Sequence, residues 1–274
     1  MWSGNLIDEY SNPDVMFMNT LMETGDLSEK TFSFYLTGLD GESYIDFGTP
    51  NKSVMDGEVI YIDSLDNIPL WAANVTAYRF HSSFDGDQSE WGMSSGVNLG
   101  ITDTGSSCIY GPSDEMNFIT SMIINHIALD NEVTFDEYWG YTFECPSTTD
   151  QPIFELLFGG YWMQVLPEDY IVDISEETDG SICGLCLVSD YYSYEWILGD
   201  AFMRGWYNIH DHKNMQMGFV PFKGSNKSGA VAAPTGVVYD KYPYLVEEKE
   251  EYDYDYDYDY ETDSEVNSVE TSYS

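Results

Sequence analysis

Basic residues are scarce in this 274-residue chain, which has 9 lysines and arginines against 49 aspartates and glutamates and a formal net charge of -40. Proteins that bind nucleic acid neutralise phosphates with lysine and arginine side chains, so this balance excludes binding of that kind. Twelve of the acids lie between Glu247 and Glu270, and the rest of the chain is still acidic. A low count of bases suits a protein that works in acid, because few positive charges then repel one another.

The chain also has no long apolar run and no visible leader. None of its apolar stretches approaches the length of a transmembrane helix, so we expect no membrane span. Residues 1–5, MWSGN, offer neither a basic n-region nor an apolar h-region, so no signal peptide is visible. Three N-x-S/T sequons, at Asn51, Asn74 and Asn226, are glycosylation candidates and point instead to the secretory pathway. A true N-terminus further upstream would reconcile these observations.

Alternating apolar and polar side chains predict a β-rich fold. In TFSFYLT, residues 31–37, the apolar Phe32, Phe34 and Leu36 alternate with polar neighbours, as in a half-buried strand. Residues 38–41 then indicate a turn, and residues 44–48 a return strand. Further strands are expected at 58–63, 71–80, 97–102, 153–158, 161–166, 182–188, 195–199, 206–210 and 216–220.

Two helices interrupt this pattern. The first is expected over residues 15–23, ending near Gly25. The second begins at Ser113, expected as its N-cap, with Asp114 and Glu115 in the first turn. One face of this helix carries residues at helical spacing, and we expect that face to pack in the core: Met116, Ile119, Thr120, Ile123, Ile124 and Ile127.

The composition changes at about Lys223. Residues 224–234 are rich in small side chains, and the sequence EEKEEYDYDYDYDYETDSE follows. Like charges at this density repel one another and bury no core, so we expect residues 224–274 to be mostly disordered. We interpret the Tyr-Asp repeat as a solvated acidic tail, with metal binding or tyrosine sulfation as the alternatives.

The sequence GITDTGSS, residues 100–107, places an acid between an apolar strand and a turn rich in hydroxyl groups. A buried carboxylate needs hydrogen bonds or a charge partner, and Thr104, Ser106, Ser107 and the Gly105 amide can supply hydrogen bonds to Asp103. A strand that ends in an Asx-type turn gives the same short sequence, so the motif alone does not settle the function.

Four segments in order along the chain resemble the C-terminal lobe of a pepsin-like aspartic endopeptidase. They are FSFYLT at 32–37, GITDTGSS at 100–107 with the following Gly111-Pro112-Ser113, LPEDYI at 166–171, and EWILGDAFMRGWYNIHDHKNMQMGFVPF at 195–222. The resemblance implies an all-β fold, a single lobe of the bilobal acid protease fold with two or three short helices. It divides the chain into a remnant of the inter-lobe segment at 1–30, the lobe at 31–222 and the acidic tail at 223–274.

The resemblance also implies roles for the residues around the motif. Asp103 is the expected catalytic carboxylate, Thr104 ties the loop to the opposite lobe, Gly105 lets the backbone approach the carboxylate, and Ser106 faces the substrate backbone. Ile197-Leu198-Gly199 is expected to cross behind the loop and support it. The chain departs from the usual pattern at Thr102, where an apolar residue is common, and at Cys108, where an aliphatic residue is common.

Four cysteines allow three pairings, and their spacing does not choose among them. The resemblance implies a disulfide between Cys145 and Cys183. Cys108 and Cys186 are then expected to be small buried side chains, with a second bridge as the alternative.

His210-Asp211-His212 places two imidazoles on one face of a strand, as in a metal site. Because no third ligand is apparent, we interpret them as surface histidines and expect neither a metal nor a cofactor.

The leading functional hypothesis is an aspartic endopeptidase that hydrolyses polypeptides through two aspartates and an activated water. Only about thirty residues precede Phe32, too few for a lobe, so Asp103 would supply one half-site, and a first lobe would be needed to complete it. A catalytically inactive peptide-binding module, or pseudoprotease, is the alternative. A homodimer in which two copies of Asp103 meet is a further possibility. We expect a secretory, lysosomal, vacuolar or extracellular location.

Overall fold

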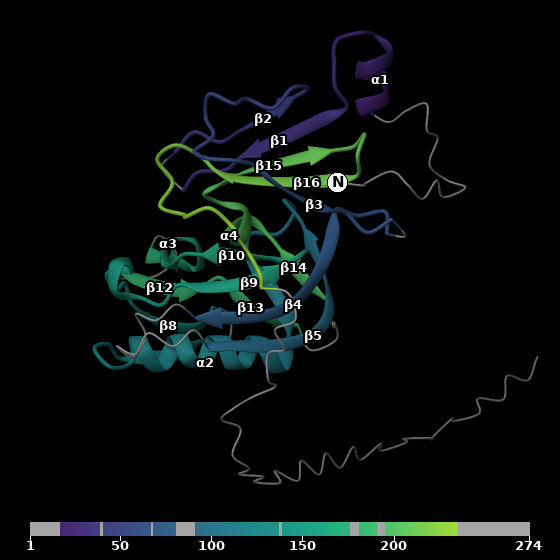
Figure 1. The fold of residues 1–274 in the computed structure, drawn as a ribbon. Helices are drawn as coiled ribbons and strands as arrows, with labels where there is room; N and C mark the ends of the chain where they lie inside the picture. The colour runs from purple at the N-terminus through teal and green to yellow at the C-terminus, as the bar shows by residue number, and fades with distance from the viewer. Residues whose placement is uncertain are drawn as a thin grey trace, which may run out of the picture. The chain divides into compact units, whose positions relative to one another are not determined.

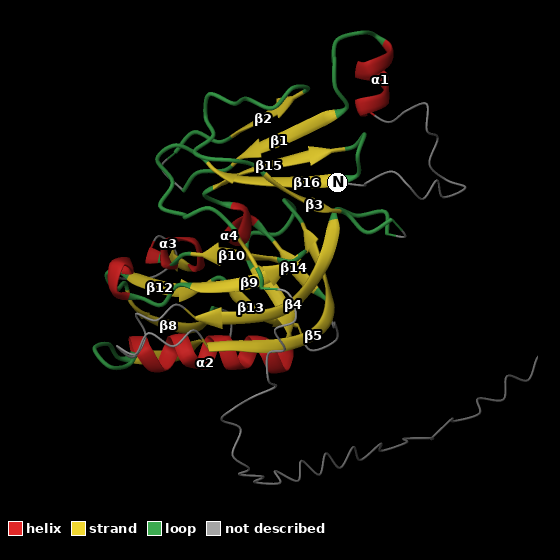
Figure 2. Cartoon of the chain, viewed as in Figure 1, coloured by secondary structure: helices red, strands yellow, loops and turns green. Residues whose placement is uncertain are grey.

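The computed structural model describes residues 17–38, 41–66, 68–80, 91–136, 139–175, 181–190 and 195–234. The expected acidic tail from residue 235 onward lies outside them. Among the described residues there are three β-sheets and four α-helices (Figures 1 and 2). The predicted all-β class is confirmed, with one or two more short helices than expected. No helix of this part of the chain is long and apolar enough to cross a membrane.

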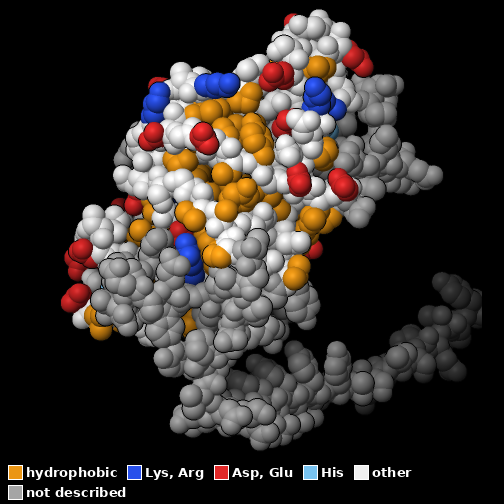
Figure 3. Space-filling view, viewed as in Figure 1, with side chains coloured by type: hydrophobic (Ala, Val, Ile, Leu, Met, Phe, Trp, Pro, Cys, Tyr) orange, Lys and Arg blue, Asp and Glu red, His pale blue; other side chains and the backbone are white. Residues whose placement is uncertain are grey.

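The first sheet has five strands in the order β2-β1-β15-β16-β3. Its strands are β1 (Thr31–Tyr35), β2 (Tyr44–Phe47), β3 (Ile60–Asp63), β15 (Trp206–Asp211) and β16 (Gln216–Pro221). Phe32 and Phe34 of β1 both enter the main core. The strand is not half-buried as expected, because Thr31 and Ser33 on its other face are buried as well. Tyr35 lies in a smaller apolar cluster with Tyr207 and Phe222, and hydrophobic side chains gather over this sheet in Figure 3.

The second sheet has eight strands in the order β13-β6-β14-β5-β4-β9-β10-β17. Its strands are β4 (Ala72–Phe80), β5 (Trp91–Thr102), β6 (Ile109–Pro112), β9 (Phe154–Phe158), β10 (Tyr161–Val165), β13 (Leu187–Asp190), β14 (Trp196–Leu198) and β17 (Val231–Ala232). β14 lies between β5, to which it is parallel, and β6, to which it is antiparallel. The loop that joins β5 to β6 therefore folds over the end of β14.

The third sheet has the order β11-β12-β8-β7. Its strands are β7 (Val133–Asp136), β8 (Gly140–Glu144), β11 (Ile171–Asp173) and β12 (Ile182–Leu185). The sequence analysis missed the β7–β8 hairpin, whose outward face carries the exposed aromatic pair Phe135 and Tyr141. Exposed aromatic residues blur the alternation on which strand prediction depends.

The helices are α1 (Phe17–Glu23), α2 (Ser113–Ile127), α3 (Pro167–Tyr170) and α4 (Asp200–Met203), with a 3₁₀ turn at Thr148–Asp150. α2 buries Met116, Ile119, Ile123 and Ile127, which is the predicted face. Ser113 is the first helical residue and not the N-cap; Pro112 occupies that position, and no side chain caps the helix. The sequence analysis did not expect α3 and α4, which are too short to show a helical period.

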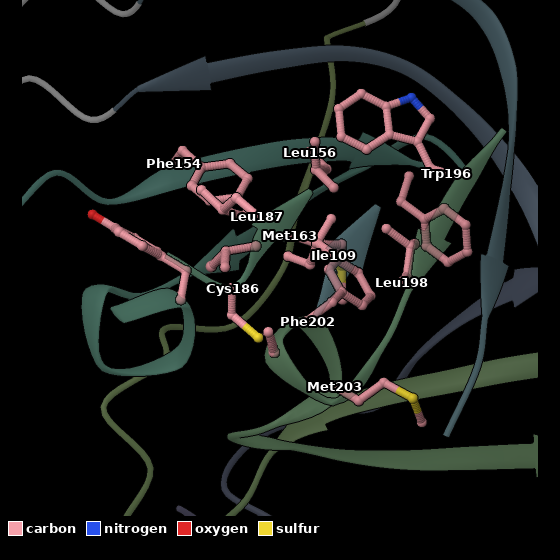
Figure 4. Close-up of a cluster of buried hydrophobic side chains, with 14 of the residues drawn as sticks. Ile109, Phe154, Leu156, Met163, Cys186, Leu187, Trp196, Leu198, Phe202 and Met203 are labelled. Atoms are coloured by element: carbon pink, nitrogen blue, oxygen red, sulfur yellow. The ribbon is translucent and has the colours of Figure 1, made fainter. Parts of the chain in front are cut away.

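The main core lies where the eight-stranded sheet meets α4 and the strands around it. Figure 4 shows Phe202 and Met203 of α4 packed with Leu198 of β14, Ile109 of β6 and Cys186. Trp71, Trp196 and Trp206 are also fully buried in this core. α4 is therefore fixed by its own apolar side chains directly behind the β5–β6 loop.

Two disulfides are present, and one of them corrects an expectation. Cys145 is bonded to Cys183, as the resemblance implies. Cys108 is bonded to Cys186 across 78 residues of sequence, so these two cysteines are not free thiols. The pairing arises because Cys108 ends the β5–β6 loop, and the Ile109 amide after it donates to the Cys186 carbonyl, 3.1 Å away.

The expected boundary at Lys223 is also corrected. Residues 224–234 do not leave the lobe: Lys227 is buried, and β17 pairs with β10. The composition of this segment suggested disorder. Its single lysine, Lys227, instead forms an ion pair with the buried carboxylate of Asp169. The ordered part of the chain therefore extends beyond the predicted lobe.

Candidate functional site

Asp103 lies immediately after β5, where three backbone contacts fix the direction of the chain. The Asp103 amide donates to the Leu198 carbonyl of β14 at 3.1 Å, and the Thr102 amide donates to the Trp71 carbonyl at 2.9 Å. The Thr102 hydroxyl donates to the same Trp71 carbonyl at 3.2 Å. Thr102, which departs from the usual apolar residue, thus satisfies its buried hydroxyl and adds a bond at the base of the loop.

The carboxylate of Asp103 is half-buried and receives its hydrogen bonds from its own loop, among the described residues. The Gly105 amide donates to Oδ1 at 2.9 Å, and the Ser106 hydroxyl donates to Oδ2 at 2.8 Å. Thr104 and Ser107, the other two candidate donors, are exposed. One bond to each oxygen fixes the plane of the carboxylate while leaving the group open to solvent.

Glycine is required at position 199 by the close approach of the loop. A Cβ there would lie 2.3 Å from the Ser106 carbonyl oxygen and 2.4 Å from that of Cys108. Real Cβ atoms do not come so close to backbone oxygens, so any side chain would push the loop away. The end of β14 therefore lies directly against the loop, at Leu198 and Gly199.

The first residues of α4 hold the far side of the same loop. The Asp200 amide donates to the Ser106 carbonyl at 2.8 Å, and the Ala201 amide donates to the Ser107 carbonyl at 3.0 Å. These two amides would otherwise be unsatisfied at the start of a helix. This contact could not be predicted from the sequence, because a helix of only four residues shows no helical period.

Asp200 is the titratable neighbour that interacts with Asp103. Burial raises the pKa of Asp200, Arg204 opposes this shift, and the charge of Asp103 adds to it. The described residues therefore place a second acid, on α4, close enough to Asp103 for their charges to interact.

The structure shows the surroundings of the His210-Asp211-His212 motif. No group of three potential ligands occurs within the described ranges. We expected His210 at the surface, but it is buried, with 3% of its surface exposed. Its ring stacks on Phe32 at 4.7 Å between ring centres and lies edge-on to Trp71 at 5.1 Å. Burial lowers the pKa of His210 to about 3. The β1 and β15 strands pair here, and this register turns the imidazole into the core.

The three sequons lie in different settings. Asn74 is exposed on β4, whereas Asn51 is half-buried and accepts hydrogen bonds from the amide and hydroxyl of Ser53. The Asn226 amide donates to Glu168 at 2.7 Å from an exposed position. All three remain candidates for glycosylation.

The sequence of this chain is similar to those of known aspartyl proteases. A family model described as "Eukaryotic aspartyl protease" matches residues 6–222. Gastricsin from Cavia porcellus is 29% identical over 209 residues, which cover 74% of this chain and 48% of gastricsin. Aspartic protease 17 from Caenorhabditis elegans is 31% identical over 179 residues, which cover 64% of this chain and 41% of that protein. The chain spans about half the length of the curated relatives it matches.

Proposed function

The chain belongs to the eukaryotic aspartyl protease family, and from this premise we propose that it is the C-terminal lobe of an aspartic endopeptidase. Its mostly-β fold with four helices is that of a single pepsin-like lobe. In this proposal Asp103 is one of two catalytic carboxylates, and a first lobe supplies the other. The observation that carries the proposal is the half-exposed Asp103 carboxylate, oriented by Gly105 and Ser106 at the end of β5.

The proposed chemistry needs both carboxylates against one water. Like charges so close do not both ionise, so the pair holds one proton and acts as base and acid together. One carboxylate takes a proton from the water as it attacks the peptide carbonyl, and the shared proton goes to the leaving amine. Thr104 is exposed, as expected for a residue that ties the loop to the opposite lobe. In this proposal Ser106, whose hydroxyl donates to Asp103, also faces the substrate backbone.

A peptide-binding pseudoprotease is the second candidate. The hydrogen bonds from Gly105 and Ser106 would hold Asp103 in the same way in a lobe that binds peptides without cutting them. Such a module would keep the fold and half of the substrate site without the paired acid. Both candidates fit the secretory pathway or another oxidising compartment, because the structure holds two disulfides.

The deciding experiment joins the chain to a first lobe that carries D-T-G, such as that of a gastricsin. We expect the isolated 274-residue chain to be inactive, and the two-lobe protein to cleave a denatured protein at acid pH, with inhibition by a pepstatin-type compound. General acid–base groups each contribute about 10²–10⁴ in rate, so Asp103→Asn should remove the activity. An inert two-lobe protein that binds peptides favours the pseudoprotease. Asp103-dependent cleavage by the isolated chain would establish the homodimer instead.

A further inference from the structure

Residues 224–234, which we call the C-terminal strap, follow the segment that matches the family and lie along the lobe. The strap runs past α4 to the edge strand β10 (yellow end of the colour scale in Figure 1). The Ser228 amide donates to the Gln164 side chain at 2.9 Å, and the Ala233 amide donates to the Gly160 carbonyl at 2.9 Å. The strap thus adds a short strand, β17, to the edge of the sheet beside β10.

Lys227 anchors the strap with a side chain that is fully buried. Its Nζ lies 3.1 Å from Asp169 Oδ2 on α3, and it donates to the Phe202 carbonyl on α4, also at 3.1 Å. The ammonium group is 5.4 Å from the centre of the Trp206 ring. Buried lysines are rare unless paired, and this one joins two helices through charge, a carbonyl and an aromatic face.

The lobe has room for this lysine at Gly205. A Cβ at that position would lie 2.9 Å from Lys227 Cε. Gly205 also has a φ of +78°, a conformation that other residues rarely adopt. The backbone conformation by itself favours glycine at position 205, and the absence of a side chain there also leaves space for the stem of Lys227.

The two helices that Lys227 joins are the supports of the Asp103 loop. α4 holds the Ser106 and Ser107 carbonyls through its first two amides. On the other side, the Tyr170 carbonyl at the end of α3 accepts from the Cys186 amide at 2.7 Å. Cys186 is bonded to Cys108, which ends the loop. Each route from Lys227 to the loop is a continuous series of hydrogen bonds and covalent bonds.

We propose that Lys227 is a positioning residue for Asp103: by fastening α3 to α4 from outside the family segment, it fixes the second half of the loop, from Ser106 to Cys108. The proposal concerns the site of the proposed function and rests on it for any effect on catalysis. Asp169 is the charged partner that a lysine at this position requires. Glu168 and Arg204, the other charged neighbours of the pair, interact with it only through their fields.

Amide hydrogen exchange on the full 274-residue chain tests the proposal without any need for activity. Lys227→Met keeps the apolar stem and removes the charge. We expect exchange at least about tenfold faster in the strap and at Asp200, Ala201 and Ile109, with the β7–β8 hairpin unchanged. The matched control is Lys223→Met, an exposed lysine at the start of the same segment, which should leave all these amides unchanged.

Faster exchange in the strap with unchanged amides at Asp200, Ala201 and Ile109 would overturn the proposal, as would an equal effect of Lys223→Met. If Lys227→Met does not fold, the wild-type chain is measured in low denaturant. There the strap and loop amides should open together, with one dependence on denaturant; a strap that opens alone contradicts the proposal.

A kinetic measurement then separates positioning from general stability. In the two-lobe protein, Lys227→Met should lower kcat by about tenfold with KM nearly unchanged, because a misplaced carboxylate affects the transition state more than binding. A rise in KM alone would contradict positioning. If the two-lobe protein is inert while the exchange result holds, the proposed function fails and the structural coupling of Lys227 to the loop stands.

Discussion

Cys108 and Cys186 join the end of the Asp103 loop to the start of β13, and the Ile109 amide next to the bridge donates to the Cys186 carbonyl. A covalent bond and a hydrogen bond thus fix the same point of the chain. The loop is held at its other end by Leu198 and Trp71. The Asp103 loop is therefore restrained on both sides, which limits how far Asp103 can move.

Peptide mapping without reduction should find Cys108 linked to Cys186 and Cys145 linked to Cys183. Removing either bridge by paired Cys→Ala substitutions should cost about 4 kcal/mol of unfolding free energy, by the loop-closure estimate. The Cys145/Cys183 pair is the matched control, because only the loss of Cys108–Cys186 should speed exchange of the Ile109 amide. Equal exchange at Ile109 in both variants would show that the loop does not depend on its own bridge.

Gly199→Ala should displace the loop. The added methyl group would meet the Ser106 and Cys108 carbonyls at 2.3 and 2.4 Å, and overpacking of this kind costs about 1–3 kcal/mol. Denaturant unfolding measures the loss, and a two-lobe protein should also lose activity. Gly229→Ala is the control, since nothing lies within 4 Å of the position of its Cβ. Equal stability of the two variants would mean that the loop yields easily.

The local parts of the fold could be predicted from the sequence, and the tertiary parts could not. Alternation predicted β1, and helical spacing predicted the buried face of α2, because each pattern lies within one element. The partner of Cys108 is 78 residues away, and the partner of Lys227 lies on α3, far away in the sequence, so neither pairing leaves a local signal. Whether His210 faces the core depends on how β15 pairs with β1.

The strap and the tail that follows it should differ in their effect on stability. Deleting residues 240–274 should change the melting temperature by only about 1–2 °C, because an acidic repeat buries no core. Deleting residues 224–274 also removes Lys227 and leaves Asp169 buried without its cation, a change that costs about 3–5 kcal/mol. Thermal unfolding of the two truncated chains separates these cases. Equal melting temperatures would show that the strap contributes nothing.

His210 should make the protein less stable in acid. Its folded pKa of about 3 lies below the ordinary value of 6.5, because burial disfavours the charged ring. Between about pH 6.5 and pH 3, His210 therefore binds a proton in the unfolded chain but not in the folded protein. The stability that the neutral ring allows is present above about pH 6.5 and is lost as the pH falls toward about 3, by roughly 1.4 kcal/mol for each pH unit.

His210→Phe keeps a flat ring against Phe32 and Trp71 and removes the titration. The variant should lose less unfolding free energy than the wild type when denaturant unfolding is compared at pH 7 and pH 4. The difference should be about 3 kcal/mol, which is the linkage accumulated over the pH units between 6.5 and 4. His126→Phe, at a half-exposed position on α2, controls for the loss of one histidine. If His210→Phe and the wild type lose equal free energy between the two pH values, the imidazole is reached by protons in the folded state, and the packing of β15 against β1 is looser than the structure indicates.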